Sequence, residues 1–165
     1  MGNIVEKAED YISSATISRE VLRDKLSEFL MVERGGLKLY EQALQVVTDA
    51  TVAAAFQEFR EQTRKHESIL LQVISGLGLD PDHISPGAKV AEQKATALQN
   101  TMRGNGLSAD AAELNAIENI ILAETKDHAD WEMLGKIARQ SDDEKIRALL
   151  TPAVARVEPL KRTNI

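Results

Sequence analysis

Residues 108–139, SADAAELNAIENIILAETKDHADWEMLGKIAR, decide the fold that we predict for this chain. Most apolar positions in this stretch recur at spacings of three or four residues, which is typical of one long amphipathic helix. The stripe that should face the protein core comprises Leu114, Ile117, Ile121, Glu124, His128, Trp131, Gly135 and Ala138. An acid and a histidine therefore stand in the middle of an otherwise apolar face, and burying them needs a compensating partner.

Two earlier stretches show the same pattern. Residues 19–47 carry an apolar stripe that passes through Glu33, and residues 50–75 carry one that includes His66. Asp49 stands at the boundary between them and is a good N-cap for the second helix. The first half of the chain thus predicts two long helices joined by a tight turn.

A last helix is expected to follow a cap at Ser141 and to run to about Leu160. Ser141 and Glu144 form a capping box, in which each side chain bonds a backbone N–H at the start of the helix. Pro152 and Pro159 cannot donate the backbone hydrogen bonds of a helix interior, so this helix should be kinked or short.

Together these segments predict an all-α fold, a four-helix bundle of two helical hairpins joined by a long crossover. The crossover spans residues 76–110 and should contain an extra helix at about 87–102. It is long enough to return along the bundle, which would make the second and third long helices parallel neighbours. We expect three parts: an N-terminal helical extension (1–18), the bundle (19–160) and a C-terminal tail (161–165).

The composition narrows the range of functions that this protein could have. The chain has 165 residues, of which 43% are hydrophobic and 28% charged, a balance typical of a folded domain. It has no cysteine, which excludes thiolate metal sites and cysteine nucleophiles. A net charge of −6 without a long basic run argues against nucleic acid as a partner. Since neither a membrane span nor a signal-peptide pattern occurs, we expect a soluble, cytoplasmic protein.

The two halves of the chain resemble each other. Glu33 and Glu124 are 91 residues apart, and the same shift aligns Tyr40 with Trp131. Each half thus carries a glutamate, then six residues, then an aromatic residue followed by another glutamate. Matching apolar stripes arise easily by chance, but matching polar and aromatic positions favour an internal duplication.

Glu33, His66, Glu124 and His128 are our candidate metal ligands. All four fall in core-facing phases of three different helices. Glu124 and His128 lie four residues apart, so both can face one ion. Carboxylate and imidazole together suit iron, manganese or zinc. The alternative is a group of buried acids and histidines that bond one another without a metal.

These features resemble the ferritin-like superfamily, which includes bacterioferritin and rubrerythrin. The similarity covers residues 19–160 and rests on the hairpin–crossover–hairpin layout, the repeat, and the glutamate of each half. It implies a carboxylate–histidine metal centre with Glu33, His66 and Glu124 among its ligands, and iron or manganese as the ion. It also implies a redox or stress-related role and a homodimer.

The sequence departs from that family's motifs in two places. Thr63 stands three residues before His66, where the family pattern has a glutamate. The last helix lacks the Glu-x-x-His motif altogether. Two interpretations therefore remain open: a remodelled metal site, or a metal-free helical scaffold or interaction module with a degenerate site.

Overall fold

The computed structural model describes residues 3–4, 6–7 and 18–162, the last five of these by backbone alone. From residue 18 onward this part forms α-helices and contains no strand, which confirms the all-α prediction. The predicted N-terminal extension and C-terminal tail lie largely outside it. The helices are α2 (Arg19–Ala43), α3 (Ala50–Gly76), α4 (Pro86–Thr101), α5 (Ala109–Gln140) and α6 (Glu144–Arg162).

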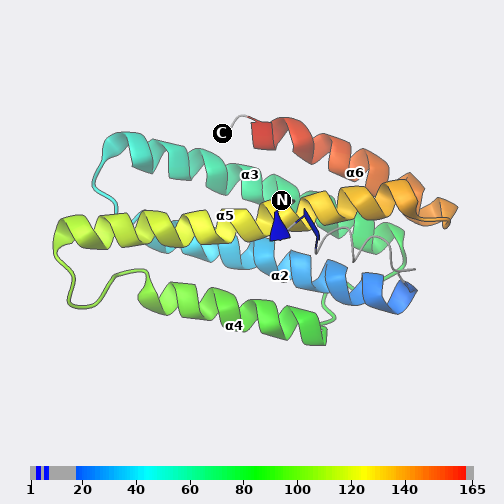
Figure 1. Cartoon of the computed structure of the whole chain (residues 1–165), viewed down its shortest axis with the longest axis horizontal. Helices are drawn as coiled ribbons and strands as arrows, with labels where there is room; N and C mark the ends of the chain where they lie inside the picture. Colours follow the sequence, from blue (N-terminus) through cyan, green and yellow to red (C-terminus); the bar gives the residue numbers. More distant parts are fainter. Residues whose placement is uncertain (1–2, 5, 8–17, 163–165) are drawn as a thin grey trace.

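The helices form two hairpins, α2–α3 and α5–α6, joined by a crossover that contains α4 (Figure 1). Helices α2 and α6 each pack against both α3 and α5, while α4 packs along the outside of α2. The predicted layout of hairpin, crossover and hairpin is therefore confirmed. Helices α3 and α5 do run in parallel, but they occupy opposite corners of the bundle, so the expectation that they are direct neighbours is wrong.

Side chains cap the helix starts as the sequence suggests, with one exception. Asp143, not the predicted box of Ser141 and Glu144, caps α6: its Oδ1 accepts hydrogen bonds from the backbone N–H groups of Lys145 and Ile146. Helix α6 continues through both prolines, yet with 19 residues it is shorter than the three other bundle helices, of 25, 27 and 32 residues. The remaining caps are Ser18 of α2, Asp49 of α3, Ser85 of α4 and Ser108 of α5.

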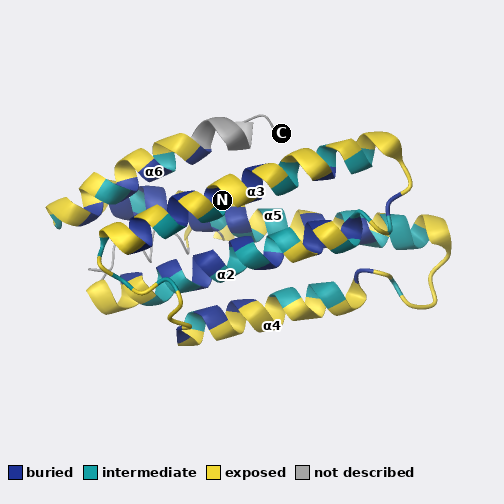
Figure 2. Ribbon diagram, turned by 180° about the vertical axis from the view of Figure 1, so that it is seen from behind, coloured by how far each residue is buried: buried dark blue, intermediate teal, exposed yellow. Residues whose placement is uncertain are grey.

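The buried apolar residues form two clusters, one toward each end of the bundle. Figure 2 shows buried positions recurring along the length of the helices. One surrounds Phe29, Leu70 and Trp131, where α6 covers the bundle. The other surrounds Tyr40 and Phe56, near the start of α5. Along α2, α3 and α5 the boundary between the clusters falls at positions where polar side chains are buried. The bundle thus has a polar layer between two apolar ones.

A glycine allows α4 to approach the bundle closely. A Cβ atom on Gly35 of α2 would lie 2.9 Å from the Cβ of Ala95 on α4, too close for a real contact. A side chain at this position would push the two helices apart. The close packing of α4 therefore depends on Gly35 having none.

The first half of α5 exposes part of the stripe that the sequence assigns to the core. Leu114 and Ile121 are each 57% exposed. The buried positions there are instead Ala116 and Ile120. Spacings of three and of four both satisfy a helical pattern, so the sequence does not determine which of two adjacent residues turns inward. The predicted stripe is therefore wrong by about one residue in this half of α5.

Candidate metal centre

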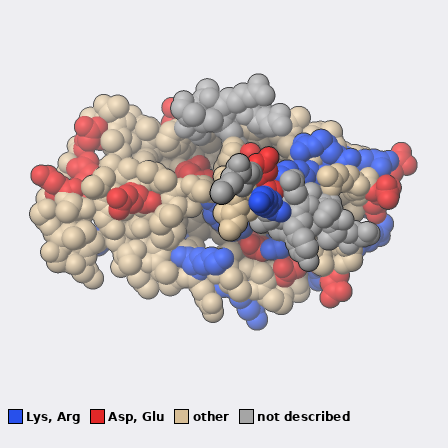
Figure 3. Space-filling view, in the orientation of Figure 1, with Lys and Arg blue, Asp and Glu red and all other residues tan. Residues whose placement is uncertain are grey.

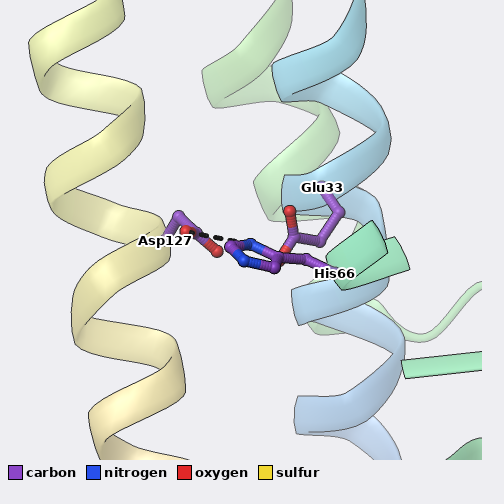
Figure 4. A group of neighbouring side chains, drawn as sticks. All are labelled: Glu33, His66 and Asp127. Atoms are coloured by element: carbon purple, nitrogen blue, oxygen red, sulfur yellow. Dashed lines mark ion pairs between the residues drawn. The ribbon is translucent and has the colours of Figure 1, made fainter. Parts of the chain in front are cut away.

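Three side chains from three helices meet in the polar layer. Glu33 projects from α2, His66 from α3 and Asp127 from α5, and the imidazole lies between the two carboxyl groups (Figure 4). His66 Nδ1 is 3.6 Å from Glu33 Oε1 and 3.8 Å from Asp127 Oδ2. One donor atom from each residue lies within 4.8 Å of the other two. The three residues therefore form one compact group of oxygen and nitrogen donors.

All three side chains are buried. The exposed fractions are 2% for Glu33, 5% for His66 and 8% for Asp127. Trp131 Nε1 donates a hydrogen bond of 2.8 Å to Glu33 Oε1, and its ring packs edge-on against His66 at 5.6 Å between centroids. This indole orients both the carboxylate and the imidazole. Polar support of this kind is what orients the ligands of known metal sites.

The donor set fits a divalent ion. Donors that surround such an ion at roughly 2.1 Å lie roughly 3.0–3.4 Å apart in octahedral or tetrahedral geometry. The separations of 3.6 and 3.8 Å from His66 are close to this range, and the Glu33 and Asp127 donor atoms lie within 4.8 Å of each other. Two carboxylates and a neutral imidazole would balance two positive charges. A buried group of this composition can therefore hold a metal ion.

The structure brings together two of the four predicted ligands. Glu33 and His66 belong to the buried group. Glu124 lies half-buried one turn before Asp127 and accepts a hydrogen bond from the Tyr40 hydroxyl. His128 does not face the core as expected: its side chain is 52% exposed and lies 3.1 Å from Glu132 on the surface. The cause is the same as for Ile121: the inward face of α5 is displaced by about one residue from the predicted stripe.

Asp127 is the member of this buried group that the predicted stripe missed. It lies four residues before Trp131 and seven after Ile120, both buried, so a helical stripe through those two residues would have included it. The predicted stripe instead stepped back three residues from Trp131 and reached His128. Both steps are compatible with a helix, and only the packing of α5 against α2 distinguishes them.

The aromatic residues and glutamates of the two halves are hydrogen-bonded crosswise. Trp131 of α5 donates to Glu33 of α2, and Tyr40 of α2 donates to Glu124 of α5. Burial and the neighbouring Glu124 carboxylate raise the pKa of Tyr40 far above its ordinary value, so the phenol keeps its proton and remains a donor. Each long helix thus supplies one donor and one acceptor to the other.

A second charged group lies beside the first, between α2 and α5. Lys126 bonds both Glu28 and Asp130. Although burial opposes it, contact with Lys25 and Lys126 holds the pKa of Glu28 below its ordinary value, so Glu28 balances the lysine charge. Burial raises the pKa of Asp130 to about 7, against a partial opposing effect of Lys126. Asp130 therefore changes its charge near neutral pH.

Replacing Asp130 by asparagine should alter how stability depends on pH. Between about pH 4 and pH 7 the folded protein keeps a proton on Asp130 that the unfolded chain releases, so the free energy of unfolding falls as pH rises. At about 1.4 kcal/mol per pKa unit, the wild-type protein should lose about 2–4 kcal/mol relative to D130N across this window. Urea unfolding of both proteins from pH 4 to 8 measures the difference. A difference in the free energy of unfolding that does not change with pH would contradict the raised pKa of Asp130.

Fold and site define the class: an all-α bundle whose polar layer holds a carboxylate–histidine group able to bind a metal ion. Residues 18–156 match the family model described as "Domain of unknown function (DUF892)", and the chain belongs to this family. Comparisons with curated proteins and with solved structures found no match. In the described part of the chain, no helix combines the length and the apolar character needed to cross a membrane.

Proposed function

We propose that this chain is a ferritin-like protein that binds one divalent metal ion, iron or manganese, through Glu33, His66 and Asp127. The observation that carries the proposal is the mutual approach of three buried donor atoms from three helices. In this proposal Glu124 flanks the ion without holding it, and His128 is not a ligand. Redox or stress-related chemistry, which the ferritin-like resemblance implies, would take place at this ion.

The crossed hydrogen bonds support the ferritin-like assignment. A duplicated hairpin would place Glu33 and Glu124, and likewise Tyr40 and Trp131, in equivalent positions about an internal two-fold axis. Such an axis requires that a bond from Trp131 to Glu33 be matched by one from Tyr40 to Glu124, and both bonds are present. The metal group itself breaks this symmetry because His66 comes from α3 alone.

The donor chemistry favours iron or manganese over softer ions. Two carboxylates and one imidazole are typical ligands of Fe²⁺ and Mn²⁺, and also of Zn²⁺. Among the described residues the buried group has three donor side chains, so water or a substrate would complete the coordination. An open position of this kind is typical of catalytic metal sites, whereas structural sites are closed.

Manganese binding should stabilise the protein and quench its tryptophan fluorescence. At about 100 times its Kd, Mn²⁺ should raise the free energy of unfolding by about 2.7 kcal/mol. Trp131 is the single tryptophan and packs against His66, so bound paramagnetic Mn²⁺ should lower its emission. His66→Gln should lose both effects. His128→Gln, on the exposed side of α5, is the matched control and should keep both.

The second candidate is a metal-free helical scaffold or interaction module. The observation in its favour is that Trp131 already donates to Glu33, which lowers the cost of burying that carboxylate without an ion. Elemental analysis after purification without chelator, with iron, manganese and zinc each supplied, distinguishes the two candidates. The scaffold predicts far less than one metal per chain, and a Glu33→Gln variant with unchanged or raised thermal stability.

A further inference from the structure

A groove opens between α3 and α5 on the side of the bundle where α6 does not reach. Helix α6 has 19 residues and α5 has 32, which correspond to roughly 28 and 48 Å of helix. Because α6 starts beside the end of α5, it leaves the first part of α5 without a fourth helix across from it (Figure 1). The cavity there has a volume of about 620 Å³, and every described residue that lines it belongs to α3 or α5.

The groove leads from the surface to the candidate metal centre. Its walls are apolar, with Phe56 and Phe59 on α3 facing Ile117 and Ile120 on α5. The exposed Ile121 also lines it, which brings the groove to the surface. Its polar lining residues include Thr63 and Glu124, and two others, His66 and Asp127, belong to the metal group.

Its size and walls fit a small organic molecule. Pockets for such ligands have volumes of roughly 300–1,000 Å³, are lined mainly by apolar and aromatic side chains, and contain a few convergent polar groups. Several of those groups present acceptor atoms here. The Thr63 hydroxyl already donates to the Phe59 carbonyl at 2.9 Å and so presents its oxygen, and the carboxylates of Glu124 and Asp127 can only accept.

The charge around the groove selects against anions. No lysine or arginine occurs among its described lining residues, whereas Glu124 and Asp127 do. Figure 3 shows acidic side chains but few basic ones toward the end of the molecule where α5 begins, while lysines and arginines gather at the opposite end. Even with a divalent ion balancing Glu33 and Asp127, Glu124 would leave a negative charge beside the ligand.

We propose that this groove binds a small apolar molecule, neutral or cationic, whose hydroxyl or amino group donates to Glu124 while its apolar body lies between Phe56, Phe59 and Ile120. That this molecule is the substrate of the metal centre rests on the proposed function. The binding itself does not, because walls and acceptors are present without an ion. A ligand seated in this way would have its polar end next to His66 and Asp127.

Three probes of one shape test the proposal: 4-butylphenol, 4-butylbenzylamine and 4-butylbenzoate, which are neutral, cationic and anionic at pH 7. Calorimetric titration of the metal-free and the Mn²⁺-loaded protein should give the phenol and the amine at least about tenfold higher affinity than the benzoate. Ala55→Trp, which fills the groove, should abolish binding. Ala54→Trp, on the exposed adjacent position outside the groove, should leave it unchanged.

A surface substitution tests the charge argument without risk to folding. Ile121→Lys places a cation at the rim of the groove and should lower the affinity for the amine about tenfold while raising that for the benzoate. Leu122→Lys, equally exposed but outside this groove, is the matched control and should change neither. Equal affinities of all three probes, or binding that survives Ala55→Trp, would overturn the proposal.

The outcomes separate this proposal from the proposed function. If the phenol binds in the groove but the protein takes up no metal, the ligand-binding proposal is supported and the proposed metal centre is wrong. If Mn²⁺ binds but none of the probes does, the proposed metal centre is supported and the ligand-binding proposal is wrong. Analytical sedimentation tests a third possibility, that a second copy of the chain covers the groove. In that case the protein is a dimer, Ala55→Trp disrupts the dimer, and no probe binds. This result would overturn the ligand assignment.

Discussion

Replacing Asp127 by asparagine is expected to lower the affinity for Mn²⁺ or Fe²⁺ by about 100-fold or more. Loss of a residue that merely orients a ligand already costs about 10–100-fold, and Asp127 is placed to bind the ion itself. The amide has almost the same shape as the carboxylate, so packing around α5 should be preserved. Titration followed by Trp131 fluorescence measures the change, and circular dichroism of the metal-free variant checks its fold.

Glu124→Gln is the matched control for this experiment. It makes the same acid-to-amide change one turn earlier on α5, at a residue that bonds Tyr40 and stands outside the group of three donors. We expect its metal affinity to fall by less than about tenfold. If Glu124→Gln proves more damaging than Asp127→Asn, the ligand set predicted from the sequence is correct and the one proposed from the structure is wrong.

Truncating Ile120 to alanine should destabilise the protein by about 2–5 kcal/mol, whereas the same truncation of Ile121 should cost about 0.5 kcal/mol or less. The two residues are adjacent and chemically identical, but Ile120 is 3% exposed and Ile121 is 57% exposed. Ile120 packs in the apolar cluster with Tyr40 and Phe56, so its loss leaves a cavity. Ile121 lies at the surface, at the rim of the groove.

Urea unfolding of the two variants measures both free energies under the same conditions. The pair tests the rotation of α5 directly, because the stripe predicted from the sequence requires Ile121 to be the more costly truncation. Large and equal losses in the free energy of unfolding for the two variants would mean that Ile121 is covered in solution. That result would favour a second copy packing on this face and count against an open groove.

The helices themselves could be predicted from local sequence. Asp49 and Ser85 act as N-caps because a short polar side chain reaches the free N–H groups of the first turn, an interaction within three residues. The length of the crossover predicted the hairpin–crossover–hairpin layout for a related reason, since a long connection can return along the bundle. These features depend on neighbouring residues or on the length of a connection, so they can be predicted from the sequence alone.

The site could be predicted only in part. Glu33 and His66 stand in stripes whose phase is well determined by the apolar residues on either side. Asp127 and His128 are adjacent on α5, where a helical stripe can include either, and the predicted stripe included His128, which is exposed. The difference is a rotation of about 100° per residue around the helix axis, which no pattern of threes and fours resolves over so short a segment.

The sequence by itself determined that the chain is helical, where each helix begins to within a few residues, and that an acid, Glu33, and a histidine, His66, would be buried with it. Only the tertiary structure decided which acid joins Glu33 and His66, and that a groove lies open beside them. Both depend on distances between helices far apart in the chain. The rotation of α5 is set by its packing on α2 and α6, and the groove exists because α6 is too short to cover the whole of α5.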